Sequence, residues 1–186
     1  AFVNAQSEVL RTKYDYIFVG GALAADLLKA KGYEVGTSLV SDSPHLKDLL
    51  TNSKILLPTD VVVENAHGRE VKKIDEVLPN DNMQDVGPAT IASLAPHIAK
   101  AKIVLWNGPM GNFEKGYSAQ TEALATLVAS GVGDSIVGGG DTIASIEKLG
   151  LNSKFEFLST AGGAMLDFLA NGTLPGLQAL ENAKTL

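Results

Sequence analysis

The segment 138–142 reads Gly-Gly-Gly-Asp-Thr and carries three kinds of group that can bind a nucleotide phosphate. Gly139 and Gly140 allow the backbone to approach a phosphate, Asp141 offers a carboxylate for a hard cation such as Mg²⁺, and Thr142 offers a hydroxyl donor. The alternative is a helix start capped by Asp141, in which the glycines only supply the turn. Three consecutive glycines directly after an apolar run support the phosphate interpretation.

A second glycine turn, Ala161-Gly162-Gly163, precedes another segment of helical periodicity. Backbone N–H groups at a helix start can bind an anion, so this turn could form a second phosphate site in the same crevice. Taken alone, the segment is better explained as a plain turn.

The segment 106–114 reads W-N-G-P-M-G-N-F-E and can shape the wall of a pocket. It combines a strand end that carries the amide of Asn107, a rigid Gly-Pro turn and the later carboxylate of Glu114, which can accept hydrogen bonds from ribose hydroxyls. The alternative is that Trp106 and Phe113 are core residues and that Glu114 is a solvated charge.

Several other kinds of site are disfavoured by the sequence. Gly20-Gly21 lacks the G-x-G-x-x-G spacing of a dinucleotide fingerprint, and G-x-x-x-x-G-K-[ST] and G-x-S-x-G do not occur. The three histidines are widely separated without metal-ligand spacing, and we expect each at the surface: His45, His67 and His97.

The elements that must position these groups follow a repeated pattern of strand, glycine turn and helix. We expect strands at 16–19, 55–57, 61–63, 70–73, 103–106, 135–137 and 155–158, and helices at 23–31, 88–100, 142–149 and 164–170. Alternating strands and helices predict an α/β fold, a Rossmann-like three-layer sandwich with a mostly parallel sheet flanked by helices. The glycine turns then lie at the carboxyl edge, where such sheets bind ligands.

Composition narrows the class of protein further. The 186 residues are 45% hydrophobic and 19% charged without an evident linker, which predicts a single globular domain over 1–186. The net charge of -6 disfavours nucleic-acid and anionic-membrane partners. Absence of cysteine excludes a disulfide scaffold, and neither a long apolar run nor a signal peptide at 1–10 is evident. We therefore expect a cytoplasmic protein.

Eight segments, in this order, carry a resemblance to a known family. They are V-G-G-A-L-A at 19–24, G-Y-E-V-G-T-S-L at 32–39, L-P-T-D-V-V-V at 57–63, D-V-G-P at 85–88, the segments 106–114 and 138–142, S-T-A-G-G-A at 159–164 and L-P-G at 174–176. From about Tyr14 onward the chain resembles the C-terminal, nucleotide-binding domain of phosphoglycerate kinase. The resemblance implies reversible phosphoryl transfer between 1,3-bisphosphoglycerate and ADP with Mg²⁺, in glycolysis.

The resemblance also implies roles for residues at matching positions. The adenine slot would be lined by Gly20, Gly21, Leu39 and Gly87. Pro109 and Met110 would flank the nucleotide, and Glu114 would bind the ribose. Around the phosphates would lie Asn107, Gly139, Gly140 and Thr142, with Asp141 on Mg²⁺ and with Gly162 and Gly163 facing the transferring phosphoryl group.

Two departures from the family pattern bear on activity. Gly20-Gly21-Ala22 replaces a glycine triplet, and the lysine-bearing G-G-A-K segment that should precede Tyr14 is absent, as is the phosphoglycerate-binding N-terminal half. Only Arg11 and Lys13 offer positive charge in 1–13. We expect nucleotide binding with a Kd from about tens of micromolar to millimolar, roughly 4 to 6 kcal/mol, and no turnover by this chain alone.

The same departures affect assembly and leave rival interpretations open. We expect a monomer that can self-associate through surface which the other half would cover. One rival is a binding or structural module that keeps the fold without useful nucleotide affinity. Another is a NAD-dependent dehydrogenase domain, which lacks its fingerprint here. Retention of Asn107, Glu114, Asp141 and Thr142 together favours the nucleotide-binding domain.

Overall fold

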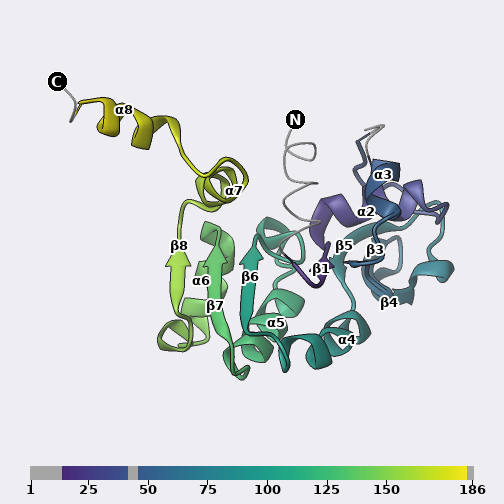
Figure 1. Ribbon diagram of the computed structural model, residues 1–186. Helices are drawn as coiled ribbons and strands as arrows, with labels where there is room; N and C mark the ends of the chain where they lie inside the picture. The colour runs from purple at the N-terminus through teal and green to yellow at the C-terminus, as the bar shows by residue number, and fades with distance from the viewer. Residues whose placement is uncertain (1–13, 42–45, 184–186) are drawn as a thin grey trace.

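The computed structural model describes residues 14–41 and 46–183 and shows an α/β fold (Figure 1). The predicted positions of Arg11, Lys13 and His45 lie outside the described residues. In chain order the main elements are β1 Ile17–Phe18, α2 Gly21–Ala30, α3 Leu46–Leu50, β2 Ile55–Leu56, β3 Asp60–Asn65, β4 Gly68–Lys73, β5 Asn82–Val86, α4 Pro88–Ile98, β6 Ile103–Asn107, α5 Ala119–Ala129, β7 Asp134–Gly138, α6 Gly140–Lys148, β8 Phe157–Ser159, α7 Gly162–Asn171 and α8 Pro175–Ala183.

The parallel strands predicted from the sequence form two sheets. β1 pairs with β2, and β6, β7 and β8 pair in that order, all in parallel. No strand pairing joins β1 to β6 within the described residues, so each keeps an edge without a strand partner. The mostly parallel α/β class is confirmed, while the parallel strands are divided between two sheets.

A third sheet is antiparallel and has the order β4-β3-β5. β3 and β4 form the predicted hairpin, with Val62 opposite Val71. β5 was not predicted, because its sequence N-M-Q-D-V has no apolar alternation and buries the polar side chains of Gln84 and Asp85. The helices α3, α5 and α8 were also not predicted from the sequence.

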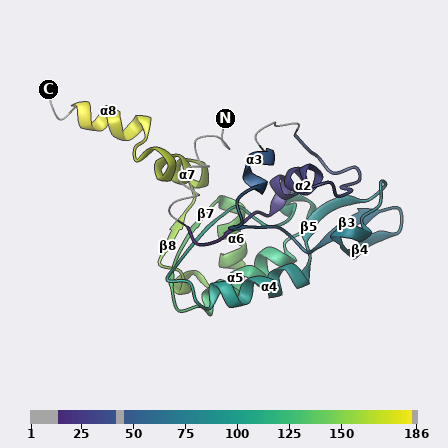
Figure 2. The same ribbon diagram turned by 45° about the vertical axis from the view of Figure 1, so that its right-hand side comes forward.

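Helices cover both sides of the β1-β2 sheet. Phe18 and Leu56 pack against the largest buried cluster, which includes residues of α4 and α5. Ile55 and Val19 pack on the opposite side against a cluster that contains Leu27 of α2. Figure 2 shows the same arrangement, with α4 and α5 on one side of the strands and α2 and α3 on the other.

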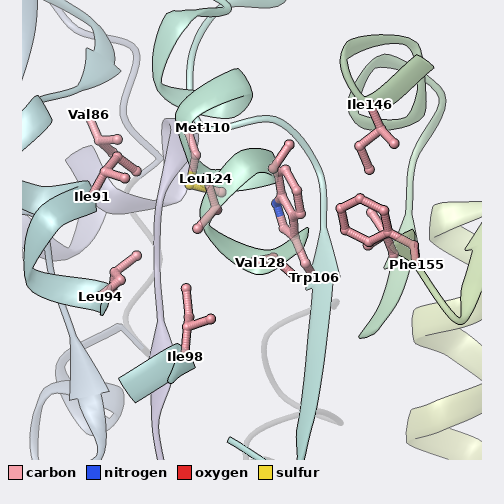
Figure 3. Close-up of a cluster of buried hydrophobic side chains, with 12 residues drawn as sticks. Val86, Ile91, Leu94, Ile98, Trp106, Met110, Leu124, Val128, Ile146 and Phe155 are labelled. Atoms are coloured by element: carbon pink, nitrogen blue, oxygen red, sulfur yellow. The ribbon is translucent and has the colours of Figure 1, made fainter. Parts of the chain in front are cut away.

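The largest cluster also supports one face of the β6-β7-β8 sheet. Trp106 lies opposite Val137, and Val137 lies opposite Leu158, so these three side chains share a face. Figure 3 shows the side chains of α4, α5 and α6 that converge with Trp106, among them Leu94, Leu124 and Ile146. Full burial of each such aliphatic side chain contributes about 1.5–3 kcal/mol, so this cluster fixes the positions of β6 and β7.

Within the described ranges, no helix is both long and apolar enough to cross a membrane.

Candidate functional site

Three glycine-bearing turns meet around the side chain of Asn107 at the carboxyl ends of β6 and β7. A Cβ atom on Gly138 would lie 2.6 Å from Asn107 Oδ1, and one on Gly162 would lie 2.4 Å from the same oxygen. Gly139 has a φ of 106°, a left-handed conformation that favours glycine. Glycine at these positions therefore allows β6, β7 and the start of α7 to meet.

Two helices begin at this junction, and their first backbone N–H groups are available. Neither α6, starting at Gly140, nor α7, starting at Gly162, has a side-chain hydrogen bond at its N-cap. Asp141 lies in the first turn of α6 and is exposed, so the capping alternative for this residue does not hold. Free N–H groups and the helix dipole make such starts suitable for anions.

Thr142 is the most informative side chain of this junction. The residue is fully buried, and its Oγ1 has no hydrogen-bond partner among the described atoms. Leaving a buried hydroxyl unsatisfied costs about 1–3 kcal/mol. The role expected for Thr142, a hydrogen bond to a phosphate oxygen at the start of α6, remains a prediction.

A cleft of about 520 Å³ lies beside this junction, between the start of α2 and β5. Of the residues predicted to contact the nucleotide, Gly21 and Leu39 from the adenine slot and the flanking Pro109 and Met110 line it. Leu39 is 84% exposed, as a side chain at the cleft mouth would be. Gly20 lies just behind, where a Cβ would be 3.0 Å from Met110 Sδ.

The segment 107–112 connects the junction to the cleft and is held by several hydrogen bonds. Gly108 N donates to Gly138 O at 3.1 Å, and Trp106 Nε1 donates to Gly108 O at 2.8 Å. Further along, Met110 N donates to Thr121 Oγ1 at 2.9 Å. The two parts of the site therefore share one firmly anchored wall.

The structure does not bring all predicted residues together. Gly87 is the N-cap of α4 and lies against Asp60, where a Cβ would be 2.1 Å from the carboxyl carbon. Glu114 is exposed in the turn Phe113–Lys115 and does not line the cleft. Gly163 is also exposed, with open space where a Cβ would be. Their expected contacts with a ligand remain predictions.

Among the cleft residues to which the sequence analysis assigned no role, two are charged, Asp85 and Lys115. Asp85 is only 6% exposed, and burial raises the pKa of its carboxyl to about 7. The motif D-V-G-P at 85–88 could have directed attention to it, but an acidic residue in a strand without apolar alternation gave no sign of burial.

The carboxylate of Asp141 is of the kind that can bind Mg²⁺ together with the phosphates of a nucleotide. No group of three or more His, Cys, Asp or Glu side chains that could bind a metal occurs among the described residues. Mg²⁺ characteristically takes one or two carboxylates together with substrate phosphates and water. The exposed carboxylate of Asp141 beside the helix starts fits this kind of shared coordination.

Fold and site together define an α/β domain with helix N-termini and a cleft at the carboxyl ends of parallel strands, an arrangement that suits phosphate-bearing ligands. The family model described as phosphoglycerate kinase matches residues 5–172. The chain belongs to the phosphoglycerate kinase family.

Individual relatives agree with this assignment. The chain is 42% identical over 188 residues to "Phosphoglycerate kinase" of Roseiflexus sp. (strain RS-1), covering 95% of this chain and 48% of the relative. It is 41% identical over 185 residues to that of Coxiella burnetii, covering 93% and 47%. The chain thus spans about half the length of the curated relatives it matches.

Solved structures show the same relationship. The "Structure of phosphoglycerate kinase from Coxiella burnetii" superposes with a TM-score of 0.83 at 39% identity, over 97% of this chain and 50% of the other. The phosphoglycerate kinase of Pyrococcus horikoshii OT3 gives a TM-score of 0.82 at 28% identity, over 97% and 48%.

Proposed function

We propose that this chain is the ATP/ADP-binding domain of a phosphoglycerate kinase. The observation that carries the proposal is that one wall, the segment 107–112, connects the cleft to the two uncapped helix starts, those of α6 and α7. This arrangement offers an apolar-lined space for a base and backbone N–H groups for phosphates.

Each part of the site then has a distinct role. The adenine occupies the cleft against Gly21 and Met110, and the phosphates extend toward the start of α6. There Thr142 donates its hydroxyl, while the Asp141 carboxylate binds the Mg²⁺ that the nucleotide brings, which neutralises phosphate charge. Glu114 reaches the ribose if its exposed turn folds over the cleft mouth.

The activity proposed for the complete enzyme is phosphoryl transfer between 1,3-bisphosphoglycerate and ADP in glycolysis. Such transfer depends on positioning and charge neutralisation, so the protein must bring both substrates together and exclude water. We assign phosphoglycerate binding to the half of the relatives that this chain does not span, and we expect no turnover by this chain alone.

A non-catalytic module is the alternative function. It would keep the fold while the phosphate site binds nucleotide too weakly to be used. The two functions differ in one measurable quantity, the affinity for Mg-ADP.

Isothermal titration calorimetry of Mg-ADP into the chain measures this affinity. We expect saturable binding with a Kd from about tens of micromolar to millimolar. Asp141→Ala and Glu114→Ala should weaken it, whereas Asp134→Ala should not, because Asp134 is an exposed carboxylate at the opposite end of β7. No heat at millimolar Mg-ADP, from protein that melts cooperatively, would support the non-catalytic module.

A further inference from the structure

A buried carboxylate lies against the wall of the cleft and contacts it at two places. Asp85, on β5, occupies the space beside Gly111, where a Cβ would be 2.4 Å from the carboxyl carbon of Asp85. The Asp85 carboxylate also accepts a hydrogen bond from Gln120 N, at 3.4 Å, in the first turn of α5.

The contact with α5 leads directly back to the wall. Gln120 is followed by Thr121, a fully buried residue whose Oγ1 accepts the hydrogen bond from Met110 N at 2.9 Å. Asp85 therefore touches the wall at Gly111 and supports the helix start that anchors Met110. Any shift of this carboxylate moves the surface expected to face the adenine.

The two carboxylate oxygens of Asp85 both act as acceptors. Oδ1 accepts from Val86 N at 2.9 Å, and Oδ2 accepts from Gln120 N. A proton on Oδ2 would place an O–H donor against the Gln120 N–H donor, so the hydrogen bond would be lost. The charge state of Asp85 is thereby coupled to the start of α5.

The charged groups on the elements around Asp85 have partners elsewhere or face the solvent. Asp26 of α2 binds Ser41, and Asp60 of β3 accepts from Ala89 N and Thr90 N. Glu122 of α5 pairs with Lys148. Three other charged residues near these elements are exposed: Lys29 of α2, Glu64 of β3 and Lys115, which follows the wall. Burial accordingly dominates the pKa of Asp85, which rises to about 7, against a smaller lowering by the Gln120 and Val86 N–H groups.

We propose that Asp85 is a positioning residue whose ionised carboxylate holds the wall 107–112 in the shape that binds nucleotide, so that protonation loosens the wall and weakens binding. The proposal rests on the proposed nucleotide-binding function. It gives the site a pH dependence of its own, separate from the titration of the nucleotide phosphates.

The first test needs no nucleotide. Trp106 is the single tryptophan and donates to Gly108 O in the same wall, so its fluorescence reports on this segment. We expect its emission to change with an inflection near pH 7, the pKa of Asp85. The inflection should vanish in Asp85→Asn. It should persist in His97→Gln, a control that removes the histidine in the last turn of α4. An inflection that instead follows His97 overturns the proposal.

A measurement on the unchanged chain guards against an Asp85→Asn variant that does not fold. The chemical shift of the Gln120 amide proton is followed in ¹H,¹⁵N NMR spectra, and that of the Asp85 carboxyl carbon in ¹³C NMR spectra. The two shifts should change with pH at the same midpoint. An Asp85 carboxyl that titrates in the ordinary range near pH 4 would also overturn the proposal.

The second test is the affinity for Mg-ADP at pH 6 and pH 8 by calorimetry. Titration of ADP itself is common to both proteins, so the ratio of Kd values is compared between the unchanged chain and Asp85→Asn. We expect the unchanged chain to lose about 5-fold more affinity at the lower pH than the variant. Equal losses would overturn the proposal, while absence of Mg-ADP binding with an intact Trp106 inflection would count against the proposed function alone.

Discussion

At the scale of single residues, the site contains two polar groups whose burial costs the folded protein free energy. The Oγ1 of Thr142 is buried without a partner, and the carboxyl of Asp85 is buried with a pKa raised to about 7. Unsatisfied or desolvated polar groups destabilise a fold. Such groups cluster at functional sites, where a function compensates for their cost. Both residues therefore permit tests in which stability and binding change in different directions.

Thr142→Val should separate stability from binding. Valine has nearly the shape of threonine and removes the unpartnered hydroxyl, so we expect the free energy of unfolding to stay equal or to rise by about 1 kcal/mol. Affinity for Mg-ADP should fall about 10-fold, because a hydrogen bond to a charged phosphate is worth about 1.5–3 kcal/mol. Urea unfolding and calorimetry measure the two quantities. Ser145→Ala is a control with a buried hydroxyl that already donates to Asp141 O. A variant that loses stability but keeps its affinity would contradict the role of Thr142.

The pH dependence of stability should carry the signature of Asp85. Below about pH 4 its carboxyl is protonated in both states, whereas between pH 4 and 7 only the unfolded chain releases the proton. The free energy of unfolding should therefore fall as the pH rises over this range, by at most about 4 kcal/mol for a pKa raised from 3.8 to about 7.

Denaturant unfolding of the unchanged chain and of Asp85→Asn at pH 4 to 8 checks this expectation. Hydrogen bonds from Asn65 and Lys72 outweigh desolvation and lower the pKa of Asp81, so its own effect on stability lies mainly below about pH 4, and both proteins share it. The difference between them isolates Asp85. A constant difference across this range would show that the carboxyl titrates normally in the folded state.

At the scale of elements, the start of α4 shows how a predicted ligand residue can also be required by the fold. Asp60 of β3 accepts from Ala89 N at 2.9 Å and from Thr90 N at 2.7 Å, and so caps the helix from a neighbouring strand. Gly87 lies directly against this carboxylate. The resemblance assigns Gly87 to the adenine slot, while its contacts show a structural reason for glycine.

Gly87→Ala should accordingly destabilise the chain. Its Cβ would lie 2.1 Å from the carboxyl carbon of Asp60, so the cap must move, and we expect a loss of about 2–3 kcal/mol. Gly176→Ala, with open space at the Cβ position, is the control and should change stability by less than about 0.5 kcal/mol. Thermal melts of the two variants decide the matter; equal melting temperatures would mean that the cap adapts without cost.

At the scale of the whole molecule, one face of the β6-β7-β8 sheet is covered and the other is more open. Leu105, Ile136 and Phe157 are paired across the three strands on the face opposite Trp106, and Phe157 is 56% exposed. Ile103, on the same face, is 63% exposed. Exposed apolar surface of this kind commonly marks a contact with another part of a protein, and the chain spans about half the length of its relatives.

Self-association should therefore increase with concentration and depend on this face. Sedimentation velocity from about 10 to 500 micromolar should show a rising average mass, which Ile103→Thr together with Phe157→Thr should reduce. Val132→Thr serves as the control, because Val132 is 88% exposed but lies in the turn before β7. A monomer at all concentrations would show that the open face is tolerated in water.

The sequence by itself determined the strands that carry glycine turns, the helices that follow them, and hence the α/β class. These features are local: apolar periodicity selects the element, and glycine is needed where φ is positive, as at Gly21 and Gly139. The family resemblance similarly depends on short local motifs. Asn107, Asp141, Thr142 and Gly162 could thus be named before their positions were known.

Only the tertiary structure decided which of these residues meet and which others join them. β5 escaped prediction because its polar residues Gln84 and Asp85 are buried by neighbouring elements, which no local pattern encodes. The division of the parallel strands between two sheets depends on hydrogen bonds between distant segments. The raised pKa of Asp85 has the same origin, since desolvation depends on the atoms that other parts of the chain place around a carboxyl.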